Sequence, residues 1–156
     1  MKFIYNLLSY FFFLFKGLTD KKKFIILTPK FLAKFFKKII IFNKIKNNFI
    51  KQYVRDIHDI DTVYEIFGNE DYDVTKYKQW NRIKDKDNHK IPLIIDCGAN
   101  IGSSAQFFLQ HFSNSKIVCV EPEKNNYEQI KKNLKFQNPE LILSAISSEV
   151  KKYEII

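Results

Sequence analysis

Residues that could hold a nucleotide-bearing cofactor are concentrated between positions 96 and 121. Asp96, Gly98, Asn100 and Gly102 follow an apolar run, and Glu121 ends the next apolar run, 25 positions after Asp96. Glycine lets the backbone pass close to a ligand, and asparagine tolerates a left-handed backbone. A carboxylate at position 121 can accept two hydrogen bonds from a ribose diol. The pattern predicts an adenosine-bearing cofactor at the carboxyl ends of two parallel strands.

The type of cofactor follows from the spacing of these residues. A dinucleotide fingerprint needs glycines at positions 98, 100 and 103, but the chain has Gly98, Asn100 and Ser103 there. The spacing matches D-x-G-x-N-x-G, a variant of the glycine-rich loop of S-adenosylmethionine enzymes. A helix that starts at Ser103 would offer free N–H groups to a carboxylate. We therefore expect S-adenosylmethionine, and a strand–turn–helix without a ligand remains the alternative.

An alternation of strands and helices must position these residues. The apolar periodicity predicts strands over 93–96, 116–121 and 141–146, and helices over 103–112 and 127–136. Short connections between them indicate a parallel sheet with right-handed crossovers. We expect the first of these strands to be buried on both faces. A short helix stopped by Gly68 is expected in the lead-in to this sheet.

The N-terminal third differs sharply in charge from the rest. Residues 1–52 contain 12 lysines and one acid, a net charge of +11, whereas residues 53–156 contain 14 basic and 16 acidic residues. A helix over 28–52 would align one stripe of lysines opposite an apolar face. Such a helix could lie on an anionic membrane, or pack on the α/β domain with its lysines in water. No base-reading motif accompanies it, and we expect no nucleic-acid partner.

One family resembles this chain over residues 55–156. Residues 94–105, then 120–122 and 133–134, resemble the FkbM family of methyltransferases, as do the lead-in at 59–67 and the segment 144–146. The resemblance implies a class I methyltransferase (Rossmann-like) α/β fold with strand order 3-2-1-4-5-7-6. It also implies methyl transfer to a hydroxyl of a sugar or another small molecule. Catalytic residues are not identified.

The resemblance also implies roles for eight residues. Asp96, Gly98, Asn100, Gly102 and Ser103 would line the methionine half of S-adenosylmethionine. Glu121 would hold the ribose. Ser144 and Ala145 would lie near the adenine.

These observations divide the chain into three segments. We expect a basic helical segment over 1–52, a lead-in over 53–91, and the N-terminal half of a methyltransferase domain over 92–156. The fourth strand of the family is not present, so we expect a truncated or split chain, with a second chain that completes the fold or a degenerate copy as the alternatives. The edge of the first strand would then be open, and cofactor binding and turnover would be weak.

Metal binding and compartment follow from the histidines and cysteines. The three histidines are scattered, and Cys97 and Cys119 lack metal-ligand spacing, so we expect no metal site. Both cysteines fall in expected strands, which is typical of buried, reduced thiols in a cytoplasmic protein. Peripheral membrane contact through residues 28–52 is the other expectation. A non-enzymatic protein that acts at a membrane surface through that segment is the alternative function.

Overall fold

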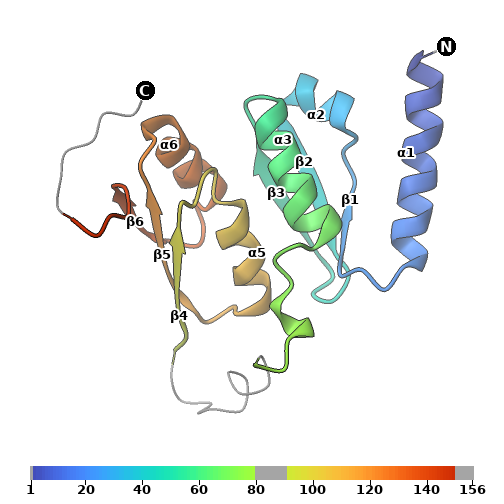
Figure 1. Ribbon diagram of the computed structural model, residues 1–156. Helices are drawn as coiled ribbons and strands as arrows, with labels where there is room; N and C mark the ends of the chain where they lie inside the picture. The colour runs from blue at the N-terminus through green and yellow to red at the C-terminus, as the bar shows by residue number, and fades with distance from the viewer. Residues whose placement is uncertain (1, 80–90, 150–156) are drawn as a thin grey trace. The chain divides into compact units, whose positions relative to one another are not determined.

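The structure, a computed structural model, describes residues 2–79 and 91–149. It divides into two compact units, Met1–Asp71 and Tyr72–Ile156, each of which is described by itself (Figure 1). Unit 1 has an antiparallel sheet and unit 2 has a parallel one.

Unit 1 is a small antiparallel sheet with helices. Its elements are α1 (Lys2–Thr19), β1 (Phe24–Ile26), α2 (Lys30–Phe36), β2 (Lys38–Asn43), β3 (Asn48–Tyr53), α3 (Ile57–Val63) and a π-helical turn (Tyr64–Asn69). The strands are ordered β1-β2-β3. Ile26, Ile39, Ile41, Ile60 and Phe67 are fully buried, so these short elements share an apolar interior.

The predicted helix over 28–52 is wrong. Only α2 is helical there, and it ends where Lys37 adopts a left-handed backbone with φ 52°. Ile39, Ile40 and Ile41 follow, and such β-branched side chains favour a strand. The Asn43 Oδ1 atom accepts the backbone N–H groups of the next turn, which closes the β2–β3 hairpin. The lysines of 28–52 therefore do not form one helical stripe.

The lead-in helix is present but is extended by an irregular turn. Asp56 caps α3, because its side chain accepts the N–H of Asp59. The Asp59 carboxylate is buried and accepts three hydrogen bonds from Arg55, from the backbone N–H and from two guanidinium nitrogens. This ion pair fixes the chain between β3 and α3.

Unit 2 contains the predicted alternation. A 3-10 turn (Val74–Lys76) precedes β4 (Leu93–Cys97), α5 (Ser103–His111), β5 (Lys116–Glu121), α6 (Lys124–Asn133) and β6 (Glu140–Leu143). The three strands are parallel in the order β4-β5-β6, which confirms the predicted strand pairing (Figure 1). The core joins both helices to the sheet through Ala99, Ala105, Leu109, Ile117, Cys119, Ile130 and Leu134.

Strand β4 is not buried on both faces, contrary to the prediction. Ile94 packs on the core, but Leu93 and Ile95 are 58% and 59% exposed and Cys97 is exposed as well. Among the described strands, β4 has one neighbour, β5, so its other edge is unpaired. Of the two cysteines expected to be buried, Cys119 is buried and Cys97 is not. Residues 151–156, whose alternation of polar and apolar residues predicts the start of another strand, lie outside the described residues.

Candidate functional site

The loop between β4 and α5 is the centre of the candidate site. It reverses direction through three residues with positive φ, namely Gly98 (81°), Asn100 (49°) and Gly102 (82°). The N–H groups of Gly98 and Ala99 both donate to the carbonyl oxygen of Val120, at 2.8 and 3.1 Å. The sequence supplies two glycines and an asparagine where the backbone is left-handed, which confirms the conformation predicted for Asn100.

The two glycines of this loop have different surroundings. A Cβ atom at Gly102 would lie 3.4–3.5 Å from side-chain atoms of Ile130 and Leu134, so Gly102 packs against α6. A Cβ atom at Gly98 would meet no atom within 4 Å, so the space beside Gly98 is open. Asn133 adds a contact from α6, because its Nδ2 atom donates to the buried carbonyl of Ile101 at 2.8 Å. The loop is therefore fixed by α6 near Gly102 and leaves space beside Gly98.

Glu121 holds the loop from the end of β5. Its side chain is 4% exposed, and its Oε2 atom accepts the N–H of Asn100 at 2.8 Å. Its Oε1 atom accepts the N–H of Glu123 at 3.0 Å and the Nδ2 group of Asn126 at 3.2 Å. A carboxylate has about four lone-pair sites, so three of them are engaged by the protein itself. The sequence placed Glu121 at this edge but gave no sign of Asn126.

Asp96 lies at the carboxyl end of β4 and meets the first turn of α5. Its Oδ2 atom accepts the hydroxyl of Ser104 at 2.6 Å. Burial raises the pKa of Asp96 and the Glu121 charge adds to that rise, whereas the hydrogen bonds from Ser104 and from the Ala105 N–H lower it. Burial, with a contribution from Asp96, also raises the pKa of Cys119 to about 12. The helix end predicted to receive a ligand carboxylate thus already faces the carboxylate of Asp96.

The remaining predicted residues lie at the same end of the sheet. Ser103 is buried at the start of α5. Ser144 follows β6, and its N–H donates to the Glu121 carbonyl at 3.2 Å, so it is adjacent to the end of β5. Its hydroxyl donates to the carbonyl of Ala145, and both residues are exposed. The carboxyl ends of β4, β5 and β6 therefore bring Asp96, Glu121 and Ser144 to one edge, as parallel strands require.

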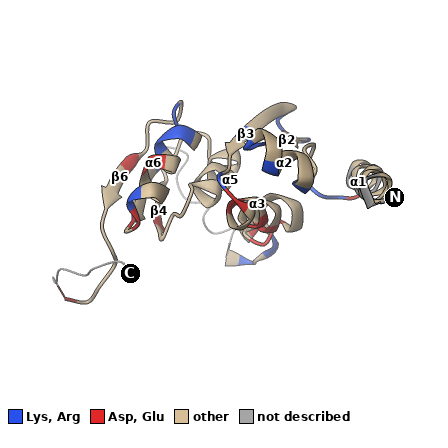
Figure 2. Cartoon of the chain, turned by 90° about the horizontal axis from the view of Figure 1, so that it is seen from above, with Lys and Arg blue, Asp and Glu red and all other residues tan. Residues whose placement is uncertain are grey.

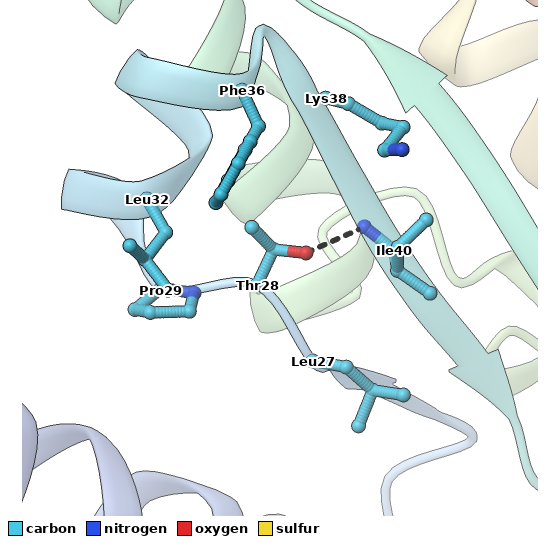
Figure 3. Close-up of a pocket in the computed structure, with 7 residues that line it drawn as sticks. All are labelled: Leu27, Thr28, Pro29, Leu32, Phe36, Lys38 and Ile40. Atoms are coloured by element: carbon cyan, nitrogen blue, oxygen red, sulfur yellow. Dashed lines mark hydrogen bonds between the residues drawn. The ribbon is translucent and has the colours of Figure 1, made fainter.

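Unit 1 has a hollow of its own, with a volume of about 290 Å³ (Figure 3). The residues that line it are Leu27, Thr28, Pro29, Leu32, Phe36, Lys38 and Ile40. The Thr28 hydroxyl accepts the N–H of Ile40 at 2.9 Å, so this polar group serves the fold. Lys38 is the one charged residue of the lining. Ligand sites combine an apolar wall with several convergent polar groups, and this hollow lacks that combination.

Among the described residues, no group of three or more His, Cys, Asp or Glu side chains is arranged to hold a metal ion. Within the same residues, no helix combines the length and the hydropathy that a membrane span requires.

Comparison of the chain with family models, with curated proteins and with solved structures found no match. The function of the candidate site must therefore be inferred from its geometry.

Proposed function

We propose that unit 2 binds S-adenosylmethionine at the carboxyl ends of β4, β5 and β6, and that the chain belongs to a methyltransferase that acts on a hydroxyl group. The observation that carries this proposal is the position of Glu121. Its carboxylate ends the strand beside β4 and contacts the glycine loop at Asn100, 2.8 Å away. In an open α/β sheet, a carboxylate in this position suits a ribose held over such a loop.

The charges of the site support a cationic ligand. Asp96 and Glu121 are close enough for the charge of Glu121 to raise the pKa of Asp96. A positive ligand group between them would relieve this repulsion. S-adenosylmethionine carries a sulfonium and an ammonium group, whereas the phosphates of a dinucleotide would add negative charge. The electrostatics favour the methyl donor over a dinucleotide.

Each residue then has a role in holding the donor. Asp96 would attract the cationic methionine half, and the space beside Gly98 would admit it. Glu121 would use its remaining lone-pair capacity for the ribose, while Ser144 and Ala145 would border the adenine. The bound donor would supply a methyl group made electrophilic by its sulfonium sulfur. These residues orient the donor; we assign no general base and leave the identity of the acceptor, a sugar hydroxyl or another small molecule, to experiment.

Titration of the isotope-labelled full chain with S-adenosylmethionine, followed by amide NMR, tests the proposal because it detects even millimolar affinity. We expect shifts at the amides of Gly98, Asn100 and Ser144, and no comparable shifts with NAD. Glu121→Gln should weaken binding at least about tenfold, since an amide cannot accept on both sides. Glu128→Gln makes the same charge change on the exposed surface of α6 and should not alter affinity.

Two results would overturn the proposal. One is the absence of amide shifts in the glycine loop at millimolar S-adenosylmethionine. The other is equal loss of affinity in the Glu121 and Glu128 variants, which would indicate nonspecific charge attraction. Thermal unfolding of both variants shows whether each one is folded during the titration.

A further inference from the structure

Helix α1 presents an apolar surface to the outside of unit 1. Six of its large apolar side chains are between 58% and 72% exposed: Ile4, Tyr5, Leu8, Phe11, Phe12 and Leu18. With 3.6 residues per turn, these six positions fall within an arc of about 140°. We call these six residues the α1 stripe. In a helix that packs on a protein core, such a stripe points inward.

The opposite side of α1 is the one that contacts the protein. Tyr10 lies there, and its hydroxyl donates to the carbonyl of Ile26 in β1 at 3.4 Å. Burial raises the pKa of Tyr10 to about 12. Leu14 and Leu7, which lie between Tyr10 and the α1 stripe around the helix, are half-buried. Figure 1 shows α1 beside β1. The helix is thus attached through one side, and the α1 stripe remains exposed on the other.

Basic residues predominate around α1. The helix contains two lysines and no acid. It is followed by Asp20, whose carboxylate accepts the Lys21 N–H at 2.8 Å, and then by Lys21, Lys22 and Lys23. In Figure 2 the body of α1 is tan, the colour of uncharged residues. The Lys44 Nζ atom donates to the carbonyl of Asp20 at 2.7 Å, which places a further cation at the C-terminal end of the helix. The Lys22 Nζ atom donates to the carbonyl of Gly68. Both ends of the apolar stripe therefore have basic neighbours.

We propose that α1 binds the surface of an anionic membrane, with the α1 stripe in the boundary between headgroups and acyl chains. An apolar helical face flanked by lysines is the usual composition of such helices. Each lysine near an anionic surface strengthens the attachment. Because no described helix is able to span a bilayer, the attachment is peripheral. This proposal does not depend on the cofactor site of unit 2.

Charge complementarity favours a membrane over a second copy of the chain. Two α1 helices packed through their stripes, parallel or antiparallel, would bring the lysines at their ends together. Like charges at such contacts repel. Anionic headgroups instead complement lysines at both ends.

Co-sedimentation of the full chain with vesicles tests the proposal. We expect binding to vesicles of phosphatidylcholine with phosphatidylglycerol, weaker binding to phosphatidylcholine alone, and release by salt. The double substitution Phe11→Ser with Phe12→Ser should lower the partition coefficient at least about tenfold, since two phenyl groups leave the lipid boundary. Phe35→Ser is the matched control, because Phe35 is a 78% exposed phenylalanine of α2 in the same unit.

Phe11 and Phe12 are both exposed, so the double variant should keep its circular dichroism spectrum and its unfolding midpoint. The proposal is overturned if the wild-type chain does not sediment with anionic vesicles. It is also overturned if the Phe35 variant loses as much binding as the double variant. A third contrary result is a lipid-free dimer that the double substitution dissociates, since the α1 stripe would then be covered by a second copy.

Discussion

The two glycines of the β4–α5 loop provide a matched test of which side of the loop faces the ligand. Gly98 and Gly102 have nearly equal φ values, 81° and 82°. An alanine in this left-handed region costs about 1–2 kcal/mol, so Gly98→Ala and Gly102→Ala should destabilise the protein by similar amounts. The extra methyl group at Gly102 makes ordinary contacts of 3.4–3.5 Å with α6, which adds little to the cost. Thermal unfolding should show comparable decreases in Tm.

Ligand binding should separate the same two variants. The methyl group of Gly98→Ala would occupy the open space beside the loop, and we expect S-adenosylmethionine affinity to fall at least about tenfold, or about 1.4 kcal/mol. Gly102→Ala points towards Ile130 and Leu134, away from that space, and should change affinity less than about threefold. NMR titration of both variants measures this. If Gly98→Ala bound S-adenosylmethionine with wild-type affinity, the ligand would not occupy the space beside Gly98. An equal loss of affinity in both variants would refute that position of the ligand as well.

Three other predictions concern stability and association. Burial raises the pKa of Asp96, so the folded state binds this proton more tightly than the unfolded chain, and stability should fall as pH rises from about 4 through the raised pKa. In urea unfolding, Asp96→Asn should remove this decrease of stability with pH, and Ser104→Ala should extend the decrease to higher pH. A wild-type stability that does not change with pH would contradict both expectations. Arg55→Gln leaves the buried Asp59 carboxylate without its guanidinium and should cost about 2 kcal/mol in urea unfolding, whereas an unchanged midpoint would contradict that role. We expect the chain to self-associate through the unpaired edge of β4, and Leu93→Lys should reduce this self-association in light scattering with less than about 0.5 kcal/mol change in stability. Unchanged scattering would contradict this role of the edge.

The order of strands and helices in unit 2 could be predicted because the residues that specify each element lie close together in the sequence. The apolar runs that end at Asp96 and Glu121, and the glycines between them, specify strand, turn and helix within a few residues of one another. Whether a face of a strand is covered depends on elements that are distant in the sequence. The exposure of Leu93 and Ile95 was therefore outside the reach of local patterns, and the apolar run predicted burial on both faces.

Unit 1 shows where helical periodicity misleads. Lysines and phenylalanines between residues 28 and 52 fit a helical wheel, but three consecutive isoleucines, Ile39 to Ile41, favour a strand. Asn43 starts a turn after them, and Asn47 has φ 50°, so the segment folds into a hairpin. These residues contained the correct signal, which the longer periodic pattern outweighed.

The candidate site was predicted at the level of the backbone and not at the level of its hydrogen bonds. Asp96 and Glu121 are at the strand ends where the sequence placed them. Their partners Ser104 and Asn126 depend on how the loops turn, which no pattern of residue types specifies. A serine in the first turn of the helix after Asp96 was the one available hint, since such hydroxyls often pair with a nearby carboxylate.

The free edge of β4 has a topological consequence. From β4 the chain winds in one direction only, through β5 to β6. A strand that followed β6 in the same chain and joined the sheet in parallel at the other edge of β4 would require winding in the opposite direction. The point at which winding reverses would then fall beside β4, and its carboxyl end is the glycine loop. In open α/β sheets the connections diverge at such a reversal and leave a crevice. The loop already occupies the floor of the crevice that an added strand would create.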